Sequence, residues 1–216
     1  MICGASIVTY EHIDPPFKDA KDHDPAAMAL LCEGCHGKVT RKFWSKDKVK
    51  EARRYPFCKR EGYSWGEFDF ANLPIIQFGG MRLVGCPIPV SVAGVPLIEV
   101  RPSPQPNAPF LLSALFCDSF GRPVLRITNN VWKAHADSWD LRCEGGRIEI
   151  REASGKYALS VLCVPPTEIA IDRLHMRHGA LELRGSANQL DVYRGGQLCG
   201  SYTDCGAENC SIGLML

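Results

Sequence analysis

Cysteine and histidine residues gather near the start of the chain at spacings that suit metal binding. Cys32 and Cys35 form a Cys-x-x-Cys pair, and His36 follows it directly in the stretch LLCEGCHGK. Two thiolates about one helical turn apart can bind the same tetrahedral zinc ion. Cys3, in the stretch MICG, supplies a third sulfur. The pattern therefore predicts a structural Zn²⁺ site formed by Cys3, Cys32 and Cys35.

The sequence leaves the fourth zinc ligand open. A Cys-x-x-Cys partner of Cys3 would fall immediately before Met1, so the chain as given could lack the start of the site. Cys58 is a second candidate, and the site could also have no fourth protein ligand. The simplest alternative is that Cys3 is a terminal thiol that binds no metal.

An acidic residue and a histidine stand roughly twenty residues before the Cys-x-x-Cys pair, in the stretch TYEHIDPP. If the strand that ends in Glu11 and His12 packs on a helix that begins near His36, the three side chains converge. One carboxylate and one imidazole can hold a divalent ion, while the other imidazole stays free to accept a proton from water. We therefore expect Glu11, His12 and His36 to form a hydrolytic site.

Short elements must position these residues. The β-branched and aromatic run ASIVTYEH predicts a strand over 5–12, which ends at Asp14-Pro15-Pro16 because proline has no N–H for a ladder bond. A polar loop leads to a second apolar run over 27–32. Helices are expected over 33–42 and 45–54, the second with Ser45 as its N-cap. The expected order is strand, loop, strand, helix.

The stretches EHIDPP and AMALLCEGCH together resemble the motif of HNH endonucleases, a family with a ββα-metal fold that is often braced by a four-cysteine zinc site. The resemblance covers about residues 1–45. It implies that His12 is the general base that activates water against a DNA phosphodiester. It further implies that Glu11 and His36 hold one catalytic Mg²⁺ (or Mn²⁺) ion, and that the cysteines bind structural zinc.

Two features depart from the family pattern. One is the missing first cysteine of the zinc site, which a truncated start of the chain would explain. The other is Ala27, which stands where the family has an asparagine that fixes the loop and helps to orient the histidine. This departure favours an alternative function, a catalytically degenerate, zinc-braced adaptor that binds nucleic acid or protein. His23 and Asp24 either lend an extra ligand from the loop or are ordinary loop residues.

The charge of the chain is uneven although the net charge is only +1. Residues 1–35 carry two lysines against six acidic residues, whereas residues 36–60 carry ten lysines and arginines against two acidic residues. A basic segment beside a cation site suits a phosphate backbone, so weakly sequence-specific binding of DNA is expected. Phe43 and Trp44 interrupt the charges and either stack on bases or anchor the helix. The predicted nucleic-acid-binding residues are Lys38, Arg41, Lys42, Lys46, Lys50, Arg53 and Arg54.

From about residue 71 onward the pattern changes to short period-two runs separated by turns. Runs such as VPLIEVR, PVLRIT and RIEIRE have strand length and alternate apolar with polar residues. This pattern predicts a β-rich accessory domain over 71–216, either a sandwich or a solenoid, after an HNH-like domain over 1–70. The fold class expected for the whole chain is α+β. The second domain would mediate oligomerisation or bind an unknown partner.

The cysteine content and the start of the sequence bear on location. Eleven cysteines are an odd number, several lie in apolar strand-like runs, and the stretch MICGASIVTYEHID has no signal-peptide pattern. We therefore expect a cytoplasmic protein with no membrane partner. A third hypothesis is that the β-rich part is a binding protein and the cysteine motif is purely structural.

Overall fold

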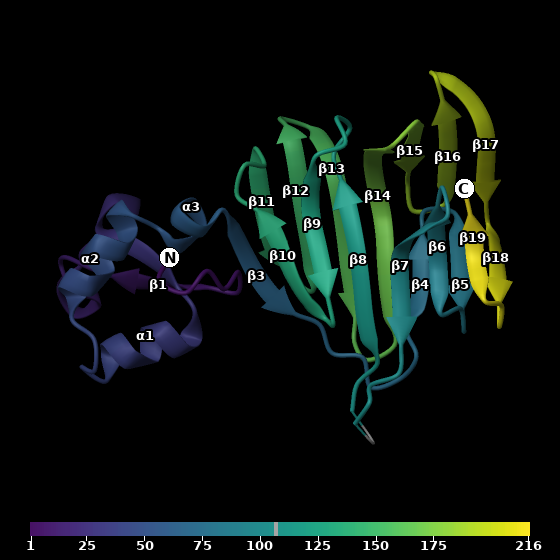
Figure 1. Ribbon diagram of the computed structural model, residues 1–216. Helices are drawn as coiled ribbons and strands as arrows, with labels where there is room; N and C mark the ends of the chain where they lie inside the picture. Colours follow the sequence, from purple (N-terminus) through teal and green to yellow (C-terminus); the bar gives the residue numbers. More distant parts are fainter. Residues whose placement is uncertain (106–107) are drawn as a thin grey trace. The chain divides into compact units, whose positions relative to one another are not determined.

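The computed structural model describes residues 1–105 and 108–216 (Figure 1). The chain divides into a first unit, Met1–Gly66, and a second unit, Glu67–Leu216. The division falls four residues before the expected boundary at 70/71. The fold is mostly β, and the three α-helices of the described residues all lie in the first unit. None of the helices in the described ranges is long and apolar enough to cross a membrane.

The first unit follows the expected order of elements. Strands β1 (Thr9–His12) and β2 (Met28–Leu31) form an antiparallel hairpin, with Thr9 opposite Leu31 and His12 opposite Met28. The loop between them contains two short 3-10 helices, η1 (Phe17–Asp19) and η2 (Pro25–Ala27). Helices α1 (Glu33–Thr40), α2 (Lys46–Arg54) and α3 (Phe57–Glu61) follow, and β3 (Tyr63–Glu67) crosses the boundary between the units.

Local capping explains where the first two helices begin. The Sγ of Cys32 accepts a hydrogen bond from the backbone N–H of Cys35 at 3.4 Å, which places Cys32 at the N-cap of α1. Ser45 caps α2, because its hydroxyl accepts from the N–H of Lys48 at 3.3 Å. The predicted N-cap is therefore confirmed.

A small core holds the first unit together. Leu31 from β2 and Val49 from α2 are fully buried, and Trp44 packs against the same cluster while Phe43 is 79% exposed. Trp44 is therefore an anchor of the helical segment, and Phe43 is available to solvent. The buried cluster consists of Ile13, Ala29, Leu31, Cys35, Val39 and Val49.

Two β-sheets form the second unit. The first sheet has the strand order β19-β6-β7-β8-β9-β10 within this unit, and the second has β11-β12-β13-β14-β15-β16-β17. Strand β4 joins the second sheet in parallel with β14, β5 pairs with β4, and β18 pairs in parallel with β5. The bounds of strands β4 to β11 are Ile75–Phe78, Met81–Val84, Ile88–Val92, Val95–Arg101, Leu111–Cys117, Pro123–Thr128, Val131–His135 and Asp140–Glu144. Those of β12 to β19 are Arg147–Ala153, Lys156–Val164, Glu168–His178, Leu181–Gly185, Gln189–Arg194, Gln197–Thr203, Cys205–Glu208 and Ile212–Met215.

Both sheets of the second unit share one hydrophobic core. Phe116 from β8 in one sheet and Ile171 from β14 in the other are 1% exposed and belong to the same buried cluster. Along β14 the buried positions alternate, but the alternation shifts between Ile171 and Leu174 because the pairing with β13 is irregular there. Such a shift is the signature of a β-bulge, which keeps apolar residues on the core side of a long strand.

Candidate functional site

The three predicted zinc ligands lie together in the first unit. The Sγ atoms of Cys3, Cys32 and Cys35 all lie within 4.8 Å of one another, and those of Cys3 and Cys32 are 3.5 Å apart. Thiolates that share a zinc ion at the usual bond length of about 2.3 Å have similar separations. The cluster therefore has a geometry that could bind a metal such as zinc, next to the start of α1.

The acid–base properties of the cluster also suit a cation. Burial, followed by the hydrogen bonds with the sulfurs of Cys32 and Cys3, raises the pKa of Cys35 to about 12. Burial also raises the pKa of Cys32, but the N–H of Cys35 and the Cys3 thiol donate to this sulfur and lower its pKa overall. One thiol thus ionises readily and another only when a cation offsets its charge. These residues fit a zinc ion.

The fourth ligand remains unassigned. Cys58 lies in α3 and is not a member of the cluster, so it is not the fourth ligand in this arrangement. The segment around Cys3 is held by its backbone, because the indole N–H of Trp65 donates to the Cys3 carbonyl at 2.9 Å. The backbone of Met1 is also engaged, since Phe57 N–H donates to its carbonyl at 2.8 Å.

Glu11 and His36 meet as the sequence predicts. The Oε2 of Glu11, from β1, lies 3.2 Å from the Nε2 of His36, from the first turn of α1. The Glu11 side chain is 7% exposed and the His36 side chain 38%, so the pair opens to solvent on the histidine side. A carboxylate oxygen and an imidazole nitrogen at this separation form an ion pair when the histidine is protonated, and both atoms are of types that bind divalent ions. No third His, Cys, Asp or Glu ligand atom joins them within 4.8 Å in the described ranges.

A lysine occupies the other side of the Glu11 carboxylate. The Nζ of Lys46, from α2, contacts the Oε1 of Glu11 and also the backbone carbonyl of His12. Lys46 was expected to contact nucleic acid, but here its ammonium supplies positive charge to the buried carboxylate. A divalent ion that binds the Glu11 carboxylate would have to displace the Lys46 ammonium from it.

The predicted convergence of Glu11, His12 and His36 is present only for Glu11 and His36, because His12 has a different set of neighbours from Glu11. Its Nε2 lies 3.1 Å from the Nδ1 of His23, and the ring of Phe17 meets it edge-on at a centroid distance of 5.3 Å. Strand alternation explains the difference, because consecutive residues of β1 point to opposite faces. His12 is buried but lines a cavity of about 660 Å³, whose other walls include Tyr10, Met28 and Leu30.

The loop that carries His23 is fixed without the asparagine of the family pattern. Ala27 contributes its carbonyl, which accepts from Ile13 N–H at 2.8 Å. The side chain of Asp24 accepts from Ala26 N–H at 2.8 Å, and Arg53 donates to the carbonyls of Pro25 and Ala26. Asp24 is thus a capping residue of η2. The contact of His23 with His12 could not be predicted from the sequence, because the residues beside a loop histidine do not indicate its partner.

Several of the predicted nucleic-acid-binding residues have partners within the chain. Lys50 pairs with Asp14 at 3.6 Å, and Arg54 lies 3.9 Å from Glu51. The Nζ of Lys38 sits 4.6 Å from the centroid of the Trp44 ring. In the part of the chain that the structure describes, no ion pair involves Arg41 or Lys42, and both are exposed. These two residues at the end of α1 are therefore the most available to phosphate.

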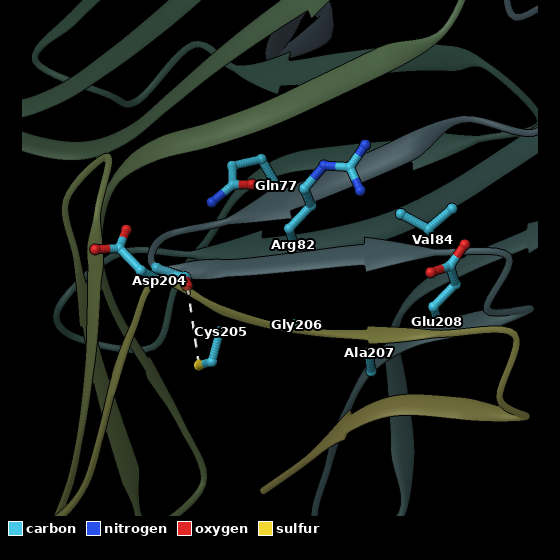
Figure 2. A pocket seen from close by; sticks show the side chains of 9 residues that line it. Gln77, Arg82, Val84, Asp204, Cys205, Gly206, Ala207 and Glu208 are labelled. Carbon is cyan, nitrogen blue, oxygen red and sulfur yellow. Dashed lines mark hydrogen bonds between the residues drawn. The ribbon is translucent and has the colours of Figure 1, made fainter.

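The second unit has a shallow site of its own. A cavity of about 470 Å³ lies over β5 and β18, and Figure 2 shows Arg82 and Glu208 among its walls. The thiol of Cys205 lies 4.0 Å from the carbonyl of Gly80. The lining residues combine one cation, Arg82, with two carboxylates, Asp204 and Glu208. The lining is Gln77, Gly80, Arg82, Val84, Asp204, Cys205, Gly206, Ala207 and Glu208.

Comparisons with protein-family models, with the sequences of curated proteins and with solved structures give no significant match.

Proposed function

We propose that the first unit is a divalent-metal-dependent endonuclease of the HNH type that hydrolyses DNA phosphodiester bonds. The observation that carries the proposal is the meeting of Glu11 and His36 at 3.2 Å, on a strand–strand–helix arrangement, with His12 next along the same strand. The two ligands come from elements that only the fold brings together. The resemblance of EHIDPP and LLCEGCH to the HNH motif names the same residues.

In this proposal the protein residues have separate tasks. Glu11 and His36 bind the Mg²⁺ or Mn²⁺ ion, which when bound supplies positive charge to the departing oxygen. His12 accepts a proton from the attacking water. Its Nε2 is engaged with His23, and its Nδ1 has no hydrogen-bond partner in the described ranges, so that nitrogen can take the proton.

The remaining features of the first unit support this chemistry. His23 holds one imidazole nitrogen of His12 and so takes over the orienting task of the absent asparagine. The three cysteines bind zinc and fix α1, and hence His36, relative to the segment around Cys3. Arg41 and Lys42, with Lys46 once it leaves Glu11, contact the phosphate backbone without reading the bases.

A plasmid-nicking assay tests the proposal. The zinc-loaded full chain is incubated with supercoiled DNA in the presence of Mg²⁺, Mn²⁺ or EDTA, and the zinc content is measured in parallel. We expect nicking that requires the divalent ion and that falls roughly 10²–10⁴-fold in His12→Ala, the usual contribution of a general base. His178→Ala, in the second unit, is the control and should nick as the unaltered chain does.

Two outcomes would contradict the nuclease assignment. Undiminished nicking by a folded His12→Ala protein would remove His12 from the reaction. Failure to cleave with any divalent ion would favour the second candidate, a zinc-braced adaptor that binds nucleic acid. The contact of Lys46 with Glu11 favours that candidate, because a lysine that neutralises the carboxylate permanently would leave no place for a metal.

The adaptor function predicts a different experimental result. DNA binding would persist without cleavage and would weaken steeply with salt. Replacing Arg41 and Lys42 together by alanine should lower the slope of log affinity against log salt by roughly two, since each phosphate contact contributes about 0.9. For the second unit we propose a β-sandwich that serves oligomerisation or binds an unidentified partner, because two sheets share one core.

A further inference from the structure

Two cysteines of the second unit lie in contact although they are far apart in the sequence. The Sγ atoms of Cys86 and Cys210 are 3.4 Å apart, and their residue numbers differ by 124. Cys86 is 3% exposed, and Cys210 is partly accessible. Both are free thiols in this structure.

The two cysteines occupy matching positions in the fold. The chain passes from the second sheet to the first between β5 and β6, and again between β18 and β19. Strand β18 pairs in parallel with β5, where Glu208 is opposite Val84, and β19 pairs in parallel with β6, where Ile212 is opposite Ile88. The register offset is 124 residues in both pairings, and the cysteine pair has the same offset. Cys86 and Cys210 are therefore register partners within one continuous parallel alignment.

Backbone hydrogen bonds on either side fix the two crossings against each other. Asn209 N–H donates to the Val84 carbonyl at 2.9 Å before the cysteines, and Ile88 N–H donates to the Ser211 carbonyl at 3.3 Å after them. The approach at Gly85 is tight, because a Cβ there would lie 2.4 Å from the Oδ1 of Asn209. The crossings cannot drift apart without breaking these contacts, so the thiols stay opposed.

We propose that Cys86 and Cys210 form a reversible intramolecular disulfide that fastens β18 and β19 to β5 and β6. A disulfide needs an S–S distance of about 2.05 Å, so the sulfurs must approach by about 1.4 Å. The reaction is exchange with a low-molecular-weight disulfide. The Cys210 thiolate, the more accessible of the two, attacks one sulfur of that disulfide and releases a thiolate. The Cys86 thiolate then attacks the mixed disulfide at the Cys210 sulfur and releases the second thiolate.

The exchange conserves electrons, sulfur atoms and protons. Two protein thiols are oxidised to one disulfide, the small disulfide is reduced to two thiols, and the two protons of the protein thiols pass to the released thiolates. In the reduced form the contact with Cys86, followed by burial, raises the pKa of Cys210. The cross-link would close a loop of more than one hundred residues. Closure of such a loop restricts the unfolded chain strongly, and we expect the melting temperature of the second unit to rise by roughly 10 °C.

The test treats the full chain with oxidised glutathione over a range of reduced glutathione. Intact mass and peptide mapping under non-reducing conditions identify the cross-link, and thermal unfolding measures its effect. We expect loss of two hydrogen masses, a Cys86–Cys210 linked peptide and the rise in melting temperature, all reversed by reductant. Cys205→Ser is the matched control, because Cys205 is an exposed thiol of the same segment, and this variant should form the cross-link normally.

The variant Cys210→Ser should lose both the linked peptide and the temperature rise while keeping the reduced melting temperature. If glutathione stays attached to Cys210 and no linked peptide forms, the proposal is overturned, because the buried partner then does not reach the mixed disulfide. A linked peptide that joins Cys210 to Cys205 would overturn it equally. Neither result bears on the nuclease, since both cysteines lie in the second unit.

Discussion

Replacing Lys46 by methionine should tighten the binding of a divalent ion to the first unit. The ammonium of Lys46 contacts the Glu11 carboxylate that is proposed to bind the ion, and the two cations therefore compete for one anion. Methionine keeps much of the apolar length of the lysine stem and removes the charge. The Glu11 carboxylate then has only His36 as an ionic partner in the described ranges.

The size of the effect follows from the burial of the pair. The Glu11 side chain is 7% exposed and that of Lys46 38%, so the pair lies between a surface ion pair and a buried one. Exposed pairs contribute about 0–1 kcal/mol, and breaking a buried pair costs about 3–5 kcal/mol. We take about 1–2 kcal/mol as the free energy that the ion must overcome to displace Lys46, which corresponds to a factor of about 5–30 in affinity.

Titration calorimetry with Mn²⁺ on the zinc-loaded protein measures this affinity. Lys46→Met should bind Mn²⁺ about 5–30 times more tightly than the unaltered chain, by the free energy of the pair. Lys48→Met is the control on the same helix, because Lys48 lies over the Trp44 ring at 3.8 Å rather than on the carboxylate. Equal or weaker Mn²⁺ binding by Lys46→Met would refute the competition. Tight binding that survives Glu11→Gln would place the ion elsewhere.

Three further predictions follow from the site and the second unit. His23→Ala should lower the rate of nicking at saturating DNA and shift the pH profile of that rate. The affinity for Mn²⁺ should stay unchanged, because His23 contacts His12 and not the Glu11–His36 pair. An unchanged pH profile would show that His23 does not orient His12. Cys35→Ser, or chelation of zinc, should lower the melting temperature of the first unit and abolish zinc retention, measured by scanning calorimetry and metal analysis, whereas Cys58→Ser should do neither because Cys58 lies outside the cluster. In the second unit, hydrogen bonds from His175 and then Arg184 lower the pKa of Glu182 below its usual value of 4.5. A carboxyl with a lowered pKa contributes stability above its unfolded pKa and loses it as the pH falls, so acid unfolding should begin below about pH 4.5 and have a shallower pH dependence in Glu182→Gln; identical pH dependences of the two proteins would exclude this contribution.

Local chemistry made the first unit largely predictable. The prolines after His12 end a strand, Ser45 caps a helix, and the Cys-x-x-Cys spacing places two sulfurs on one turn, because each of these effects acts within a few residues. The predicted convergence of Glu11 with His36 and of the three cysteines is present in the structure. Glu11, His36 and the three cysteines lie in or beside short strands and helices, and the order of these elements along the chain restricts how the elements can pack.

Long-range partners could not be predicted in the same way. Lys46 lies 35 residues after Glu11, and nothing in its neighbourhood distinguishes it from the other lysines of a basic helix. Trp44 and Phe43 are adjacent and similar in type, yet the packing of the helices places one against the core and leaves the other exposed. The pairing of Cys86 with Cys210 depends on a parallel alignment across most of the second unit, for which period-two patterns carry no information.

The late strands β18 and β19 have a consequence for how the second unit is made. Leu214 is part of the core, and its strand completes one sheet while β18 lies against β5 of the other. During synthesis on the ribosome, more than one hundred residues must therefore be added after β5 and β6 before their parallel partners are made. The backbone groups on the edges that β18 and β19 later cover stay open to other chains in that interval. A nascent chain stalled before residue 205 should thus bind chaperones more strongly than one in which residues 205–216 have left the ribosome.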